Sequence, residues 1–217
     1  MRSRRGHLNA EVFIATIIYI DGQNFLYKVS ERLEKANLIS DKQDIISIDI
    51  RGLLEPLFPK QELEIRYYGV KRISHSKDFD EEMSEKANRF SDNLRRFKNY
   101  LTKNKVAYIP KGSLKARSIE PCRKCGYSAY RFQEKGVDVG LAIDLVSDTI
   151  LGKTKKIALL SSDTDLLPAL QIIKDKNIDV TYISFSGQAT VSLIKASNHH
   201  LSLRDLDVCN AYIRSLN

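Results

Sequence analysis

The chain has 217 residues, of which 35 are Lys or Arg and 27 are Asp or Glu, so its formal net charge is +8. With 42% hydrophobic residues it can form a sizeable core, which excludes an intrinsically disordered protein. Three cysteines are too few for a small secreted scaffold held together by disulfides. We expect one domain over residues 1–217.

The first elements alternate between strand and helix. Residues 13–20 follow a basic start and end at Asp21 rather than at a small-residue cleavage site, which favours a buried strand over a signal peptide. Helical spacing of apolar residues predicts a helix after Asn24 and a short helix at 48–58, and residues 63–70 alternate like a strand.

The same alternation continues to the end of the chain. Helices are predicted at residues 80–103, 137–150, 164–176, 188–197 and 205–215, and strands at 106–109, 156–160 and 178–185. Alternating strands and helices, with several strands apolar throughout, predict an open parallel sheet covered on both faces. No stretch approaches the roughly 20 apolar residues that span a bilayer. We expect a cytoplasmic protein without membrane contact.

The positive charge is concentrated in the middle of the chain. Residues 86–135 contain 14 basic and 3 acidic residues, whereas the segments on either side are close to neutral. Within this segment, residues 111–135 lack clear periodicity, and we expect them to form a basic, Cys-containing insertion. Such a segment predicts a polyanionic partner, although a well-solvated surface fits the composition about equally well.

Three acidic motifs occupy comparable places. Asp21 follows the first strand, Asp138 stands at a helix start, and Asp163 and Asp165 follow a later strand. Because ligands bind at the carboxyl ends of the strands in open α/β sheets, Asp21 and Asp163 are expected to lie within reach of each other. Each motif alone also fits a turn or a helix N-cap, but the three together favour a metal site.

Repulsion between the carboxylates indicates that this cluster needs a cation, and the ligand types indicate which one. Two carboxylates 4 Å apart repel by about 4 kcal/mol at an effective dielectric constant of about 20, so several can converge only with a proton or a cation. Mg²⁺ and Mn²⁺ fit best, since no nearby His or Cys accompanies the acids, and such ions activate water against phosphoryl groups. Asp144 falls on a different helix face from Asp138 and carries less weight.

The segments IDGQNF (residues 20–25), KGVDVGLAID (135–144) and LSSDTDL (160–166) resemble the three signatures of NYN domains. They are most similar to the LabA-like (DUF88) branch, which is related to PIN-domain nucleases, and the resemblance spans about residues 14–200. It implies a PIN-like α/β fold: a three-layer α/β/α sandwich with a mainly parallel central sheet. It also implies metal-dependent RNA cleavage at an acidic centre.

The resemblance also implies site residues. Asp21, Asp138 and Asp163 would hold Mg²⁺ or Mn²⁺, and Asp165 would be a fourth acid or a supporting group. Asn24 would orient a ligand or water beside Asp21. Ser162, which stands where family members commonly have Gly, would sit at the strand end.

The main functional hypothesis is therefore a ribonuclease that acts on single-stranded or structured RNA. The basic segment would guide the RNA backbone, and its candidate contacts are Arg95, Arg96, Arg123, Lys124 and Lys135.

Two alternatives remain. A non-catalytic RNA-binding or regulatory module is motivated by Ser197 and Asn198, which stand where the family commonly has an Ala-Asp pair. A dehalogenase-type phosphatase would use Asp163 and Asp165 as nucleophile and acid.

Cys122 and Cys125 form a C-x-x-C pair in the basic segment. This pair resembles half of a zinc knuckle, and it would need two further ligands, because a structural zinc ion takes four. A second copy of the chain, in a homodimer, would supply another pair. The same spacing also fits two reduced thiols in a basic loop.

Overall fold

The computed structural model describes residues 15–40, 47–71, 73–74, 81–118, 124–125 and 130–216. Six parallel strands form the central sheet in the order β4-β2-β1-β7-β8-β9. They are β1 (Thr16–Asp21), β2 (Leu63–Val70), β4 (Val106–Lys111), β7 (Lys156–Leu160), β8 (Asp179–Phe185) and β9 (His199–Leu203). The central strands β1 and β7 are buried along nearly their whole length, which explains their continuous apolar sequence.

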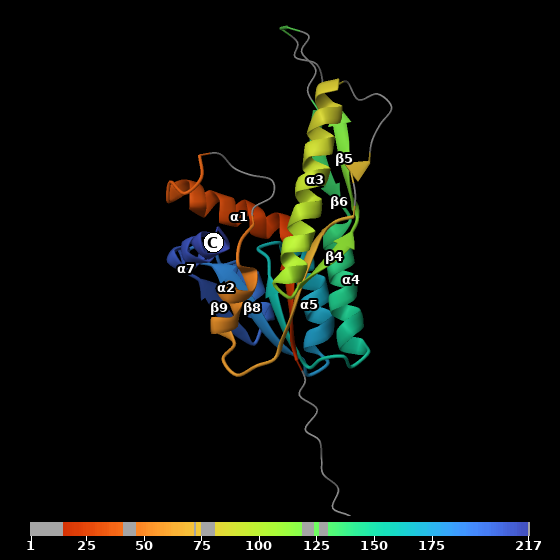
Figure 1. Ribbon diagram of the computed structural model, residues 1–217. Helices are drawn as coiled ribbons and strands as arrows, with labels where there is room; N and C mark the ends of the chain where they lie inside the picture. The colour runs from red at the N-terminus through yellow and green to blue at the C-terminus, as the bar shows by residue number, and fades with distance from the viewer. Residues whose placement is uncertain are drawn as a thin grey trace, which may run out of the picture.

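Helices cover both faces of this sheet (Figure 1). One face packs against α1 (Gly22–Lys35), α2 (Ile50–Leu54) and α7 (Asp205–Ser215). The other packs against α4 (Val137–Ile150), α5 (Leu167–Lys174) and α6 (Val191–Ala196). The long helix α3 (Glu81–Lys103) precedes edge strand β4 in the chain and contributes to both cores. The expected three-layer α/β/α sandwich is thereby confirmed.

A second, three-stranded sheet stands beside the first. It contains β3 (Ile73–Ser74), β5 (Ser113–Ser118) and β6 (Tyr130–Lys135), with β5 and β6 antiparallel. Figure 1 shows β5 and β6 next to α3, at the end of the molecule away from α2. The basic insertion expected at 111–135 thus contains the antiparallel pair β5 and β6, which agrees with a small hairpin, one of the two forms that the sequence allows for it.

Two further differences from the expected elements have clear causes. The helix expected at 48–58 divides into α2 and the 3₁₀ helix η1 (Glu55–Leu57), since Pro56 has no N–H to continue α-helical bonding. Strand β9 was not expected, because its sequence, HHLSL, is largely polar and mostly exposed at the edge of the sheet. None of the helices in the described part of the chain combines the length and apolar character that crossing a membrane requires.

Gly22, the first residue of α1, lets this helix lie close to β2. A Cβ at this position would be 2.2 Å from the Tyr68 carbonyl oxygen and 2.4 Å from Cε1 of Tyr67. The Tyr67 hydroxyl donates a 2.9 Å hydrogen bond to the Gly22 carbonyl oxygen. The Asp21-Gly22 pair therefore reflects a packing constraint, which fixes α1 and with it the end of β1.

We expect Gly22→Ala to lower the free energy of unfolding by about 1–3 kcal/mol, because the new methyl group meets a strand carbonyl that cannot move away. Urea denaturation followed by circular dichroism measures the change. The control, Glu34→Ala on the exposed side of α1, should stay within about 0.5 kcal/mol of the wild type. Equal stability of the two variants would contradict the packing constraint.

Candidate active site

Asp21 and the motif that contains Asp163 lie beside each other at the point where the strand order changes direction. From β1 the order runs through β2 to β4 on one side, and through β7 and β8 to β9 on the other. Ile20 of β1 pairs with Leu160 of β7, so Asp21 and Ser161 follow side by side at the carboxyl ends of the two strands. Ligands of open α/β sheets bind at such a switch point.

Hydrogen bonds hold the Asp21 carboxylate in place. Its Oδ1 accepts a 3.2 Å bond from the Asn24 backbone N–H, which caps α1, and its Oδ2 accepts a 2.9 Å bond from the Ser161 hydroxyl. The same Ser161 Oγ accepts a 3.0 Å bond from the Asp163 backbone N–H. The buried Ser161 therefore links two of the predicted acids, a role that sequence reasoning did not assign to it.

The Asn24 side chain is bonded to the loop after β7. Its Nδ2 donates to Ser162 Oγ at 2.8 Å, and its Oδ1 accepts from the Ser162 backbone N–H at 3.2 Å. These two bonds tie the first turn of α1 to the end of β7. In this structure, Asn24 and Ser162 therefore position Asp21 and its surroundings.

Asp21, Asp138 and Asp163 lie near enough to interact electrostatically. Burial raises the pKa of the Asp21 carboxyl, the bonds from Asn24 and Ser161 oppose this rise, and the charges of Asp163 and Asp138 add to it. Asp138 lies in the first turn of α4, where the helix dipole favours a negative charge. The structure thus brings three of the four predicted acids to one centre.

Glu134 is a further acid at this centre that the sequence analysis missed. Burial, followed by the charges of Asp21 and Asp138, raises the pKa of Glu134 to about 7. The residue lies on β6, so the second sheet contributes a carboxyl to the end of the first. The sequence contains one signal that could have identified it: Glu134 is one of only 3 acidic residues in the strongly basic segment 86–135.

Asp165 lies at the edge of this centre, whereas Asp144 is engaged elsewhere. The exposed Asp165 lies in the 3₁₀ helix η2 (Thr164–Leu166), and it lines an open groove of about 530 Å³ between α4 and α5 together with Asp138. Asp144 pairs with Lys111 at 2.8 Å and accepts a 3.2 Å bond from the Tyr68 hydroxyl. The prediction that Asp144 carries less weight than Asp138 agrees with this ion pair.

Asn198, the residue behind the non-catalytic alternative, lies at the opposite end of the sheet. Its Oδ1 accepts a 2.9 Å bond from the Val180 backbone N–H, and its own N–H donates to the Val180 carbonyl at 2.8 Å. These bonds join the starts of β8 and β9, whereas Asp21 lies at the carboxyl end of β1. An Asn at this position therefore removes no acid from the centre around Asp21.

The donor chemistry of this centre fits a hard divalent cation. Its carboxyl groups offer only oxygen atoms. Burial first, and then the charges of the neighbouring acids, raise the pKa values of Asp21 and Glu134, and a cation would stabilise the ionised forms. Among the residues that the structure describes, no three Asp, Glu, His or Cys side chains are grouped closely enough to hold a metal ion as they stand. Cation binding at this centre thus requires its carboxyl groups to come closer together than they stand here.

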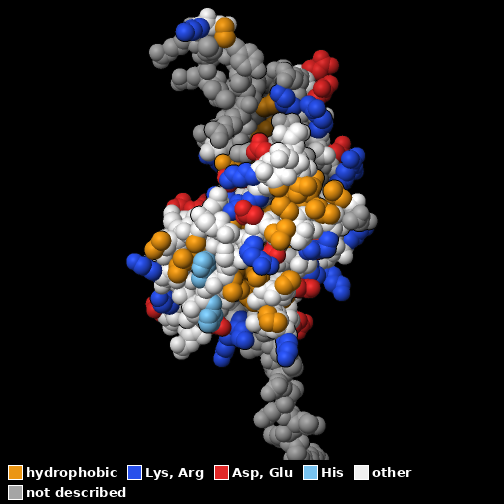
Figure 2. Space-filling model, turned by 90° about the vertical axis from the view of Figure 1, so that its left-hand side faces the viewer, with side chains coloured by type: hydrophobic (Ala, Val, Ile, Leu, Met, Phe, Trp, Pro, Cys, Tyr) orange, Lys and Arg blue, Asp and Glu red, His pale blue; other side chains and the backbone are white. Residues whose placement is uncertain are grey.

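The predicted basic contacts are dispersed. Arg95 bonds to Asp92 at 3.2 Å on the exposed side of α3, and Arg96, Lys124 and Lys135 are also exposed. On the face shown in Figure 2, Lys and Arg side chains are scattered among hydrophobic ones rather than gathered into one patch. Cys125 is an exposed free thiol, while Cys122 and Arg123 lie outside the described residues, so the zinc site stays a prediction.

Fold and acidic centre together define a nuclease-like α/β/α protein. The family model of the NYN domain matches residues 15–204, and the chain belongs to the NYN domain family. This confirms the family expected from the three sequence motifs.

Two individual proteins are also similar to this chain. It is 27% identical, over 90% of its length and 70% of the other, to 6-hydroxy-3-succinoylpyridine 3-monooxygenase from Pseudomonas putida. A crystal structure of a protein of unknown function from Vibrio parahaemolyticus matches with a TM-score of 0.54 and 17% identity, over 90% of this chain and 96% of that one. The second likeness supports the fold alone.

The raised pKa of Glu134 predicts a specific pH dependence of stability. Between its ordinary value of 4.5 and about 7, the folded protein binds more protons at this site than the unfolded chain does. The free energy of unfolding should therefore fall as pH rises through this window, by up to about 3 kcal/mol from this group. Glu134→Gln should remove that part of the fall, as measured by urea denaturation at pH 4.5 and 8 in EDTA.

The control for this measurement is Glu34→Gln, which replaces an exposed acid on α1 and should leave the wild-type pH dependence unchanged. If Glu134→Gln loses as much stability as the wild type between the two pH values, Glu134 is not the coupled group.

Proposed function

We propose that this protein is a metal-dependent ribonuclease. The observation that carries the proposal is the half-buried Asp21 at the switch point, under the electrostatic influence of Asp138 and Asp163. Membership of the NYN family supports it, because NYN domains are usually nucleases.

In the proposed reaction, Asp21, Asp138 and Asp163 hold Mg²⁺ or Mn²⁺, with Asp165 beside Asp138. When bound, such an ion supplies Lewis acidity and lowers the pKa of water near a phosphodiester. The chain's own residues provide the orientation. Ser161 and the Asn24 backbone fix both oxygens of Asp21, so this carboxylate needs no rearrangement when substrate arrives.

RNA is the proposed substrate because of the basic segment. Residues 86–135 supply α3, β4, β5 and β6, and β6 leads through Lys135 and Gly136 directly to Asp138. Exposed Lys and Arg attract the phosphate backbone from a distance, and salt weakens this attraction. A strand bound along this segment is thereby delivered to the acidic centre.

The ribonuclease proposal is tested by cleavage of end-labelled RNA with Mn²⁺. We expect Asp21→Asn and Asp163→Asn to lower the rate at least about 100-fold, since each removes a proposed metal ligand. Asp175→Asn, which changes an exposed acid after α5, is the matched control and should cleave like the wild type. EDTA should abolish cleavage and added Mn²⁺ restore it. Equal rates for the wild type and Asp163→Asn would refute the proposal, and RNA binding without any product would favour the non-catalytic alternative.

A second candidate function is oxygenation of a hydroxylated pyridine. Two observations favour it: the similarity to the Pseudomonas putida monooxygenase, and an aromatic cavity of about 330 Å³ that Glu134 lines. A monooxygenase transfers one oxygen atom from O₂ to its substrate and needs two electrons from a reductant such as NADH to form water. Consumption of O₂ and NADH that depends on added 6-hydroxy-3-succinoylpyridine would support this function. Its absence, together with metal-dependent RNA cleavage, would favour the ribonuclease.

A further inference from the structure

A cavity of about 330 Å³ opens directly beside the acidic centre, between α1, α3 and the second sheet. Gly22, the residue after Asp21, lies at one end of it, and Glu134 also lines it. An engineered cavity of roughly 150 Å³ already accepts benzene, so this one has room for a six-membered ring with substituents.

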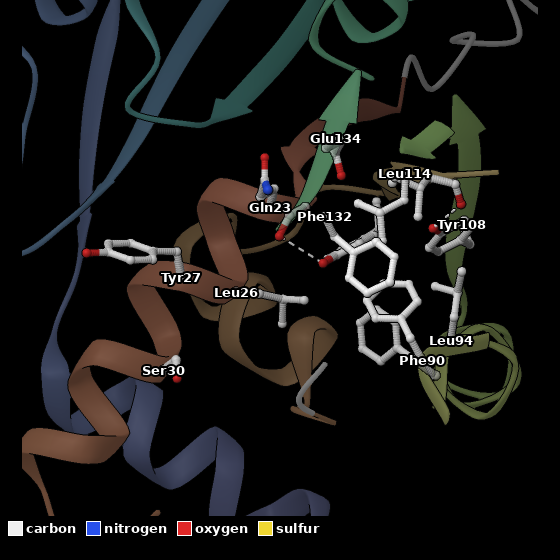
Figure 3. Close-up of a pocket in the computed structure, with 15 residues that line it drawn as sticks. Gln23, Leu26, Tyr27, Ser30, Phe90, Leu94, Tyr108, Leu114, Phe132 and Glu134 are labelled. Carbon is white, nitrogen blue, oxygen red and sulfur yellow. Dashed lines mark hydrogen bonds between the residues drawn. The ribbon is translucent and has the colours of Figure 1, made fainter. Parts of the chain in front are cut away.

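Aromatic rings form much of the cavity wall. Phe90 of α3 and Phe132 of β6 lie with their ring centroids 6.4 Å apart, and Tyr67 stacks on Tyr108 at 5.8 Å. Figure 3 shows the Phe90 and Phe132 rings next to each other, close to Leu94 and Leu114. Flat apolar walls of this kind favour a planar ligand that stacks or packs edge-on.

Both tyrosine hydroxyls are already bonded to the backbone. Tyr67 donates to the Gly22 carbonyl oxygen at 2.9 Å, and Tyr108 donates to the Val70 carbonyl oxygen at 2.8 Å. Their phenol groups therefore complete the wall of the cavity and offer their rings, rather than a free proton, to a ligand.

Polar groups occupy the other side of the cavity. In Figure 3 the Glu134 carboxyl points from β6 toward the ring cluster, and Gln23 stands nearby on the first turn of α1. Within the described part of the chain, neither side chain has a hydrogen bond or an ion pair. A half-buried carboxyl without a partner is costly, so a ligand that donates an N–H to Glu134 would gain a charge-assisted bond.

We infer that this cavity binds a planar six-membered nitrogen heterocycle whose edge carries an N–H donor beside an acceptor. Glu134 accepts the N–H, the Gln23 amide donates to the neighbouring acceptor, and the aromatic walls enclose the ring. A pyrimidine base within RNA and a free pyridone share this edge. The inference extends beyond the proposed function, because binding needs neither a metal ion nor cleavage.

The test measures dissociation constants by ligand-observed NMR titration in EDTA at pH 8, with 2-pyridone and cytidine 5′-monophosphate as probes. Glu134→Gln and the exposed Gln23→Ala should each weaken binding about tenfold, whereas Glu34→Gln should not. N-methyl-2-pyridone, which has the same shape without the N–H, should bind the wild type about tenfold more weakly than 2-pyridone does. If the wild type binds neither probe, or binds with the same affinity as both pocket variants, the inference is overturned.

The two probes also separate the sources of the ring. Tighter binding of cytidine monophosphate supports the site as a subsite for an RNA base, while equal or tighter binding of 2-pyridone supports it as a site for a free heterocycle. Asp163 is not among the residues that line the cavity, so the Asp163→Asn variant should bind both probes like the wild type. If this variant loses RNA cleavage and still binds the probes, the heterocycle site and the nuclease centre are separate. The heterocycle site can then be refuted without refuting the nuclease, and the reverse also holds.

Discussion

The Asp21 carboxylate is half-buried near other carboxylates at the junction of β1 and β7, and hydrogen bonds from α1 and from the end of β7 hold it there. Burial and the charges of Asp163 and Asp138 favour its protonated form, while the bonds from Asn24 and Ser161 favour the ionised one. The pKa of Asp21 remains raised, so these bonds do not fully offset the unfavourable terms. Ionised Asp21 is therefore less stable here than in water, and this gives the centre affinity for a proton or a cation.

The packing of α1 on β2 couples this centre to the aromatic cavity. Gly22 must remain without a side chain because Tyr67 and the Tyr68 carbonyl fill the space beside it. Its carbonyl oxygen accepts the Tyr67 hydroxyl, while the preceding Asp21 caps the helix. A ligand that presses on the Tyr67 ring therefore acts on the same turn of chain that orients Asp21. Asp21 and Gly22 are consecutive residues, so the acidic centre and the cavity share one turn of the chain.

Sequence patterns identify the parts of this architecture that depend on local order. Apolar runs predicted the central strands. The positions of Asp138 at a helix start and of Asp163 after a strand indicated two acids whose charges act on Asp21. Glu134 escaped because it reaches the centre only through pairing of β5 with β6, whose polar sequences carry no clear periodicity. Whether Ser161 or Ser162 faces Asp21 depends on the twist of the chain as it leaves β7, which spacing alone does not determine.

The basic segment ends at the acidic centre: Glu134, Lys135 and Asp138 lie within five consecutive residues of the chain. A phosphate drawn along the basic surface would be repelled by Asp21, Glu134 and Asp138 at the end of its path. In the proposed function, a bound divalent cation reverses this repulsion, because it neutralises the carboxylates and attracts the phosphate. Binding of cation and of RNA must then strengthen each other by equal factors, as thermodynamic linkage requires. In the proposed function, access of RNA to Asp21 would therefore depend on the bound ion.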